Sequence, residues 1–434
     1  MTRLRRELDA EKAARATDRA RLDRLEAEIH RPSPPLPEAP PPPARTARLG
    51  LTLSGFAQLD FQARQSSQDQ LNNATSAPLN EDRFLVRRAR AKIDLDYGIV
   101  AGAVEFDGNT VNGASARIIN AEASLRWPPP APGELPRVQG TVGLFKTPFG
   151  FEVLQSDRDR LFMERSTAER ALFPGEYDLG VRVSGGWRFL RYAFGLMNGD
   201  PLGEKLYPGR DPNGDKDLVG RVGIDTELAA RVRVVAGFSA LAGTGLHPGT
   251  PATKDVLVWR DINEDGVVNP GEIQVIPGSA PSPSKNFDRS AIGGDFRLQV
   301  RVPALGELSA YGEIYSATNL DRAILVADPV SAGRDLRERG YYAALTQELG
   351  RHFMVGARYD FYDPDADALD QRAGMVIPKD SSFDALSVTG AFLYSFGRFS
   401  VEYDRNRNHN GRDAAGNPTN LKDDAIIARG QVQW

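Results

Sequence analysis

The residues whose types and spacing best suit chemistry lie in one short segment, residues 261–272. Asp261, Asn263 and Asp265 alternate with other residues, Gly266 follows, and Glu272 ends the segment. This is the pattern D-x-[DN]-x-[DN]-G-x5-E, in which side-chain oxygens, one backbone carbonyl and a bidentate Glu surround a calcium ion. The sequence therefore predicts a structural Ca²⁺ site with the ligands Asp261, Asn263, Asp265, Val267, Asn269 and Glu272.

The residues on both sides of this segment indicate strands, because residues 256–259 and 273–276 are rich in Val, Ile, Leu and Trp. A calcium loop of this kind usually joins two helices, so we expect an EF-like loop at the tip of a hairpin instead. The alternative is an Asp/Asn/Gly turn without metal. A weaker copy at Asp211 to Asp217 has Val222 where the Glu would stand, and we interpret it as a solvated turn.

A second set of chemically suited residues is basic and lies on strands. Over residues 88–96, charged side chains take every second position and apolar ones fill the positions between them. The charged residues are Arg88, Arg90, Lys92, Asp94 and Asp96. Five charges on one face of a strand cannot lie in an ordinary protein core, so this face needs water or mutual pairing.

Alternation of this kind continues from residue 49 to residue 434 and predicts an all-β fold. We count sixteen candidate strands, beginning near residues 50, 83, 98, 115, 137, 178, 190, 218, 231, 288, 305, 338, 352, 383, 398 and 423. The count is even, and long polar segments alternate with short turns, as in a transmembrane barrel. No run approaches the roughly 20 apolar residues of a membrane-spanning helix. The sequence therefore predicts a 16-stranded antiparallel transmembrane β-barrel over residues 49–434, with the calcium hairpin in an external loop at 244–287.

Aromatic residues near the predicted strand ends suit the girdles of such a barrel at the membrane interfaces. They include Trp127, Phe145, Trp187, Tyr192, Tyr359, Phe361, Tyr362, Phe396 and Phe399. The chain ends in a strand with a terminal aromatic, Trp434, which resembles the assembly signal of bacterial outer-membrane proteins.

Two segments precede the predicted barrel. Leu8, Leu22, Leu25 and Ile29 follow a heptad pattern, which predicts a periplasmic coiled-coil helix over residues 1–31. The alternative is a solvated charged helix without a partner. Residues 32–48 contain a run of prolines, which indicates an extended, semi-rigid linker. Residues 1–30 contain no apolar signal core, although a barrel of this kind must be exported.

Composition excludes several other functions. The 54 basic and 58 acidic residues give a net charge of −4, which argues against a nucleic-acid partner. The four histidines lie in no recognisable Ser-His or Asp-His arrangement, and no G-x-S-x-G occurs, so we expect no enzyme.

Three stretches resemble the phosphate-selective porin family, of the porin O and P type. They are residues 142–150 (VGLFKTPFG), residues 162–166 (FMERS) followed by 178–181 (DLGV), and residues 198–200 (NGD). Residues 87–90 (RRAR) and 357–360 (ARYD) are shorter matches. The resemblance implies a trimer in the outer membrane, loops folded into the pore, and anion passage along basic residues that face the lumen.

The candidate pore-lining and anion-binding residues are Arg88, Arg90, Lys92, Arg126, Lys146, Arg165 and Arg182. Arginine suits this role because its fork of donors matches phosphate oxygens. Acidic residues including Asp60, Glu105 and Asp107 are predicted to face the same lumen, so opposite charges would pair across the wall at most positions. We therefore expect an outer-membrane porin for small hydrophilic solutes, with a preference for anions or phosphate. The alternative is an envelope tether that projects the coiled coil from a plugged or narrow barrel.

Overall fold

The computed structural model describes residues 12–13, 15–22, 49–65, 82–131, 134–204, 210–372, 374–409, 411–412 and 417–434. The chain divides into two units, Met1–Ala47 and Arg48–Trp434. In the first unit, residues 12–13 and 15–22 are helical and exposed. The rest of the predicted coiled-coil helix, and the whole of the predicted linker at 32–48, lie outside the described residues. No helix among the described residues is long and apolar enough to cross a membrane.

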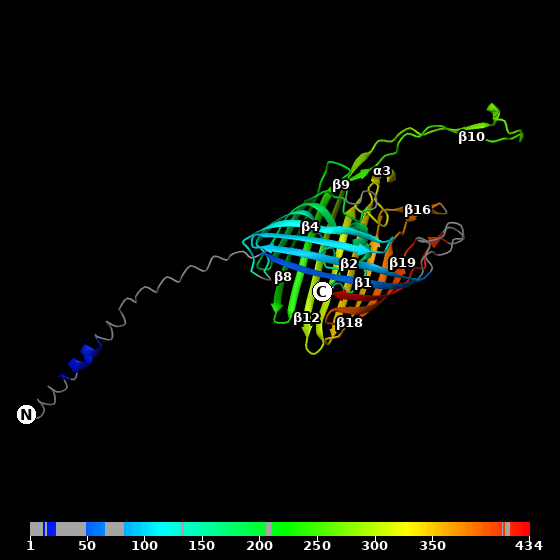
Figure 1. The fold of residues 1–434 in the computed structure, drawn as a ribbon. Helices are drawn as coiled ribbons and strands as arrows, with labels where there is room; N and C mark the ends of the chain where they lie inside the picture. Colours follow the sequence, from blue (N-terminus) through cyan, green and yellow to red (C-terminus); the bar gives the residue numbers. More distant parts are fainter. Residues whose placement is uncertain are drawn as a thin grey trace, which may run out of the picture. The chain divides into compact units, whose positions relative to one another are not determined.

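Sixteen strands form one closed antiparallel barrel, which confirms the predicted architecture (Figure 1). Each strand pairs with the next barrel strand along the chain, and β22 pairs with β1 to close the barrel. The strands are β1 (Gly50–Arg64), β2 (Asp82–Tyr97), β3 (Val100–Asn109), β4 (Ser115–Trp127), β5 (Val138–Lys146), β6 (Tyr177–Trp187), β7 (Leu190–Met197), β8 (Asp217–Ala229), β9 (Val232–His247), β12 (Lys285–Val302), β13 (Gly306–Thr318), β14 (Arg337–Leu349), β15 (Phe353–Asp363), β18 (Phe383–Tyr394), β19 (Gly397–Arg407) and β22 (Ala425–Gln433).

The remaining described elements belong to the long connections between barrel strands. Three two-stranded sheets pair β10 with β11, β16 with β17, and β20 with β21. Their strands are β10 (Val256–Trp259), β11 (Ile273–Ile276), β16 (Leu369–Arg372), β17 (Met375–Pro378), β20 (Gly411–Arg412) and β21 (Pro418–Thr419). Three short helical segments are α2 (Thr167–Leu172), η2 (Pro270–Glu272) and α3 (Pro329–Ala332).

The strands present apolar side chains outward and polar ones inward. In β14, every second residue from Glu338 to Ala344 is buried and the residues between them are exposed. In β1, Gln58, Asp60 and Gln62 are buried inside the barrel, whereas Leu51 and Leu59 are exposed on its outer face. This reverses the pattern of a water-soluble sheet and follows from the period of two along a strand.

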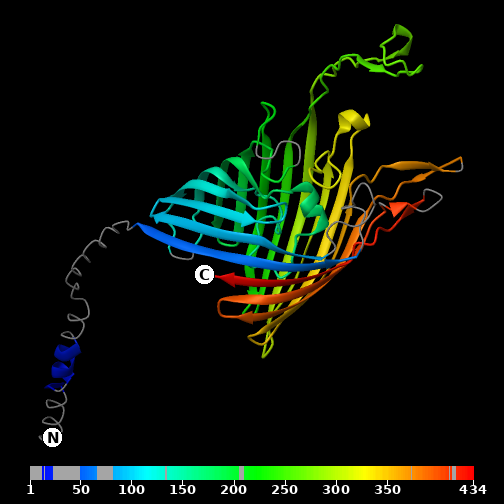
Figure 2. The same cartoon turned by 45° about the vertical axis from the view of Figure 1, so that its right-hand side comes forward.

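The two ends of the barrel differ in their connections. The short turns include residues 98–99 and 188–189, and at this end Gly50 pairs with Asp96 and Phe56 pairs with Gln433. Both ends of the barrel sequence therefore lie at the short-turn end. The longest connection, between β9 and β12, leaves the opposite end and carries the β10–β11 hairpin well away from the barrel (Figures 1 and 2).

Two of the predicted girdle aromatics point inward, contrary to the prediction. Phe145 and Tyr362 are both 0% exposed and belong to an apolar cluster inside the barrel. Trp127, Trp187 and Phe396 are exposed on the outer face, as predicted. The reason for the difference is that a loop packs against Phe145 and Tyr362 within the lumen.

Candidate functional site

One connection folds into the barrel. It joins β5 to β6 over residues 147–176, contains α2, and is called the lumen loop below. Phe149, Leu172 and Phe173 of this loop are buried against inward-facing side chains of β7, β8, β9, β12, β13 and β15. These side chains are Met197, Val219, Leu241, Ala291, Tyr315, Ala317 and Tyr362. The loop thereby fills one side of the lumen with an apolar core.

Wall carboxylates, among them Glu313 and Glu402, accept hydrogen bonds from backbone N–H groups of the lumen loop. Glu313 on β13 accepts from Phe151 at 2.7 Å and from Glu152 at 2.6 Å. Glu402 on β19 accepts from the N–H of Met163 at 3.1 Å. Irregular backbone leaves such donors without a ladder partner, and an unpaired buried donor costs about 1–3 kcal/mol. Sequence analysis did not single out either residue, although an acidic residue on the inward face of each strand was a visible signal.

Three wall arginines complete the attachment by donating to carbonyl groups of the loop. Arg358 on β15 donates to the carbonyl of Glu164 at 2.8 Å, and Arg429 on β22 donates to that of Met163 at 2.9 Å. Arg398 on β19 donates to the carbonyl of Arg160. Loop and wall therefore contact each other around much of the barrel, which fixes the loop across the lumen.

A buried ion cluster joins the loop to β2. Asp157, whose side chain is 1% exposed, lies 3.3 Å from Arg88, 2.8 Å from Arg90 and 2.8 Å from Arg160. Burial alone would raise the pKa of Asp157, but the three arginines hold that pKa well below its usual range. Glu164 lies 3.1 Å from Arg88 and is held ionised in the same way, because the nearby arginines outweigh its burial and lower its pKa.

Glu169 on α2 has the opposite environment. Burial, together with the nearby carboxylates of Glu313 and Glu152, raises its pKa well above the usual value. The hydroxyl of Tyr315 donates to Glu169 at 2.5 Å. A protonated Glu169 therefore suits this position, since a charge here would face two other acids.

A polar cavity of about 510 Å³ lies between the lumen loop and the wall formed by β1 to β6. The loop contributes Leu154, Ser156 and Arg158 to its lining. The charged residues that line it are five basic and three acidic, namely Arg90, Lys92, Lys146, Arg158 and Arg182 with Asp94, Glu105 and Glu122. The cavity is thus charged on several sides, in contrast to the apolar core on the other side of the loop.

Four of the seven predicted pore-lining residues line this cavity: Arg90, Lys92, Lys146 and Arg182. Lys92 lies 2.7 Å from Asp94, and its side chain is 37% exposed. Lys146 donates to the carbonyl groups of Val153 and Gln155 at 2.9 and 2.7 Å and lies 2.8 Å from Glu176. Arg182 lies 3.4 Å from Glu122, and its guanidinium stands over the ring of Phe145.

The other three predicted residues lie elsewhere. Arg88 is under the loop in the ion cluster. Arg126 lies at the short-turn end, 2.8 Å from Asp96. It also donates to the carbonyl of Gly98 at 2.9 Å. Arg165 is buried within the loop itself, where it donates to the carbonyl of Phe173 at 2.7 Å. Arg158, absent from the predicted set, lines the cavity with a side chain that is 41% exposed.

The predicted calcium loop forms the tip of the β10–β11 hairpin, as expected. Asp261 accepts hydrogen bonds from the N–H groups of Asp265 at 3.1 Å and Gly266 at 2.8 Å, and Gly266 adopts a φ of +71°. Glu272 instead accepts from the indole of Trp259 at 3.1 Å and from the N–H of Ile262 at 3.3 Å. Across the described part of the chain, no three acidic or histidine side chains converge closely enough to hold a metal ion. The donor types suit Ca²⁺, but Glu272 would have to leave Trp259 to join them.

Histidines at the long-loop end of the barrel pair with acids. Nδ1 of His247 lies 2.7 Å from Asp328, and Nε2 of His409 lies 3.3 Å from Asp380. Ser331 donates to the same oxygen of Asp328 at 2.7 Å. Because His247 and Ser331 both bond to the acid, they do not form the nucleophile–base couple of a hydrolase.

No protein-family model and no curated protein sequence matches the chain. Solved structures match its fold. They include the trimer form of OmpT, an outer membrane protein of Vibrio cholerae, with a TM-score of 0.51 and 11% identity over 89% of this chain and 99% of that one. The outer membrane channel DcaP of Acinetobacter baumannii matches with a TM-score of 0.52 and 12% identity, over 90% of this chain and 99% of that one. An anion-selective porin from Comamonas acidovorans matches with a TM-score of 0.51 and 9% identity, over 89% of this chain and 100% of that one. At these identities the likeness shows the fold, a 16-stranded barrel of the outer-membrane porin type.

Proposed function

We propose that the chain is an outer-membrane porin through which small hydrophilic solutes diffuse passively. One observation carries the proposal: a charged cavity of about 510 Å³ lies beside the lumen loop, inside a closed barrel with an apolar outer face. The apolar face suits the hydrocarbon of a membrane, and the charged lining keeps the interior wet. The long loops would face the cell exterior, and residues 1–31 would lie in the periplasm. The trimer form of the similar OmpT supports a homotrimer.

A weak preference for anions follows from the charges of the cavity. Its lining has five basic residues against three acidic ones, which raises the local anion concentration. Lys92 and Arg158 have the most exposed side chains among the five basic residues that line the cavity. Arg88, Arg90 and Arg182 are already engaged with carboxylates, so few donors are left to bind a phosphate in a bidentate way. The charges therefore support weak anion preference more than phosphate selectivity.

The test is single-channel conductance and reversal potential of the purified full chain in a planar bilayer with a salt gradient. We expect stepwise openings with a reversal potential on the anion side, and little block by phosphate. The double substitution Lys92→Gln and Arg158→Gln removes two positive charges from the cavity and should move the reversal potential toward the cation-selective side. Arg334→Gln, which removes one positive charge outside the cavity, should leave the reversal potential unchanged.

The second candidate is the envelope tether. The observation that favours it is the attachment of the lumen loop to β13, β15, β19 and β22, with an apolar core on one side of the lumen. A correctly folded barrel that conducts no ions would contradict the porin and support the tether.

We also propose that residues 261–272 bind one structural Ca²⁺. The donor set and the turn at Gly266 support this proposal. The ion would supply a cross-link that orders the hairpin tip. Asp261, Asn263, Asp265 and Glu272 would hold it with side-chain oxygens, together with the carbonyl of Val267.

A further inference from the structure

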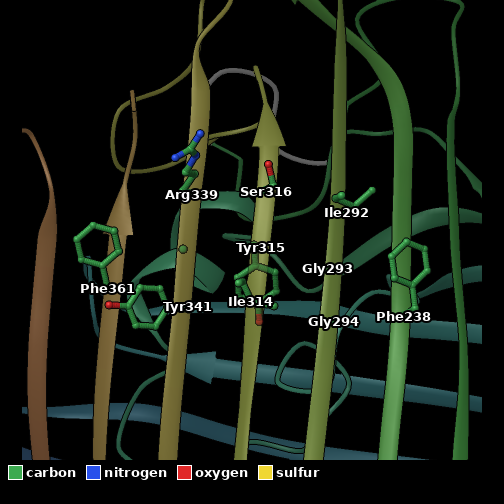
Figure 3. Close-up of a pocket in the computed structure, with 11 residues that line it drawn as sticks. Phe238, Ile292, Gly293, Gly294, Ile314, Tyr315, Ser316, Arg339, Tyr341 and Phe361 are labelled. Atoms are coloured by element: carbon green, nitrogen blue, oxygen red, sulfur yellow. The ribbon is translucent and has the colours of Figure 1, made fainter. Parts of the chain in front are cut away.

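The outer face of the barrel carries an apolar groove of about 580 Å³ across β9, β12, β13, β14 and β15 (Figure 3). Five outward-facing residues form one row of cross-strand partners: Phe238, Gly294, Ile314, Tyr341 and Phe361. Gly294 has no side chain, so the wall is hollow between Phe238 and Ile314. The stacked rings of Tyr341 and Phe361, with centroids 5.3 Å apart, form the opposite side of the groove.

A second hollow of about 570 Å³ continues the groove toward the short-turn end. The two hollows share Gly294 and Ile314. The next row of outward partners contains Gly312 and Ala343, so small residues continue the floor. From Ser316 to Ala310 along β13 is six residues, or about 20 Å of strand. One leaflet of a bilayer has a hydrocarbon depth of about 15 Å, so the groove is long enough for an extended acyl chain.

A cation stands at the end of the groove nearest the long loops. Arg339 lines the groove beside Ser316, its cross-strand partner, one row beyond Tyr341 (Figure 3). Its neighbours on the loop side, Arg334 and Arg337, form ion pairs with Asp365 and Asp367. Among the described residues, Arg339 makes no hydrogen bond and no ion pair within 4 Å, although the carboxylates of Asp363 and Asp367 lie close enough to interact with it.

Other charged groups near Arg339 favour a ligand with a concentrated negative charge. Asp363 is its cross-strand partner on β15, and its carboxylate accepts the N–H of Asp365 at 3.1 Å. Asp367 also lies close enough to interact with Arg339, so a ligand anion must compete with two nearby carboxylates. A phosphomonoester can do so, because it carries close to two negative charges and matches the guanidinium fork.

We propose that this groove binds one acyl chain of a phosphate-bearing glycolipid of the outer leaflet, with Arg339 donating to the phosphate. The proposal rests on the outer-membrane location proposed above. Arg339 would contact the phosphate of an anionic amphiphile, and the apolar groove would contact its acyl chain. Tyr341 and Phe361 pack the chain along one side and Phe238 along the other.

The experiment is native mass spectrometry of the full chain in detergent, titrated with diphosphoryl lipid A and, separately, with monophosphoryl lipid A. Gly294→Leu should fill the groove without moving the backbone, because a Cβ there meets only Ile314 at 3.8 Å and the carbonyl of Gly237 at 4.0 Å. We expect this variant to lose binding of both lipids. Arg339→Gln should weaken binding of the diphosphoryl form by about tenfold, as expected for one charge-assisted hydrogen bond. Asp363→Asn should strengthen it.

Matched controls lie on the same outer face away from the groove. Gly390→Leu on β18 has open space around its Cβ, and Arg405→Gln removes an exposed arginine from the loop end of β19. Both should bind lipid as the parent does. Equal lipid binding by the parent, Gly294→Leu and Arg339→Gln would overturn the proposal.

Two measurements, the oligomeric state and the conductance, separate the lipid proposal from a subunit contact and from the porin proposal. If Gly294→Leu dissociates the oligomer and leaves lipid binding intact, the groove is a contact between subunits and the lipid proposal is wrong. Conductance of the same variants tests the porin independently, since the groove lies outside the lumen. A variant that conducts normally and has lost lipid binding supports both the porin proposal and the lipid proposal.

Discussion

Replacing Asp157 with Asn tests whether the buried ion cluster holds the lumen loop in place. The substitution keeps the shape of the side chain and removes the charge that Arg88, Arg90 and Arg160 share at 3.3, 2.8 and 2.8 Å. Removing one partner of a buried ion pair typically costs about 3–5 kcal/mol, because the other charge stays buried without compensation.

The remaining contacts reduce this cost toward its lower limit. Arg88 keeps Glu164 at 3.1 Å, and Arg90 keeps Asp107 at 3.2 Å. Among the described residues, the acidic partner that Arg160 keeps is Glu176, at 3.9 Å. We therefore expect a cost of about 3 kcal/mol, concentrated on Arg160. Since 1.4 kcal/mol is a factor of ten, release of this part of the loop should become about 100-fold more frequent.

The assay is the rate and amplitude of conductance fluctuations in a planar bilayer, together with thermal unfolding of the purified barrel. Asp159→Asn is the matched control, because it removes the same charge two residues away. Asp159 has a side chain that is 56% exposed, and its ion pair within the described residues is with the exposed Arg158, so its loss should cost less than about 1 kcal/mol. Equal fluctuations and equal melting temperatures for the two variants would refute the reasoning.

The remaining predictions concern pH and calcium. Because burial and the nearby Glu313 and Glu152 raise the pKa of Glu169, the folded loop keeps a proton that the unfolded chain releases above about pH 4.3. Stability should then fall as pH rises from that value toward the folded pKa. Glu169→Gln should remove this loss, as measured by melting temperature against pH, and an unchanged slope would contradict the assignment. Terbium added to the full chain should luminesce through Trp259 and be displaced by Ca²⁺. Glu272→Gln should weaken that signal at least tenfold, whereas a signal that survives unchanged would exclude the loop as its source.

The strands were predictable because the signal for a barrel strand is local. Alternation at a period of two, interrupted by turn residues, is contained in each segment of about ten residues. All sixteen predicted strands are present, and β1 closes on β22. The inward position of Phe145 and Tyr362 was missed for a related reason. Alternation assigns residues to two faces, but it does not reveal that a loop builds an apolar core inside one part of the lumen.

The attachment of the lumen loop could not be predicted, because its partners are far apart in the sequence. Arg429 donates to the carbonyl of Met163 at a separation of 266 residues, and Glu402 accepts from the N–H of the same residue at a separation of 239. Such pairs depend on the closure of the barrel and on its register. The sequence indicated that opposite charges would pair, but it did not indicate that the loop would supply the partners of Arg88 and Arg90.

The position of those partners determines where selectivity can come from. Asp157 and Glu164 of the loop neutralise the arginines of β2, so the charges that fix the loop are the ones that a solute cannot use. Lys92 on the wall and Arg158 on the loop remain more exposed, and each has one carboxylate beside it. The field in the cavity is therefore a small difference between nearly balanced charges. A single substitution in the lumen loop should change the sign of selectivity more readily than a substitution among the buried arginines, which would first loosen the loop.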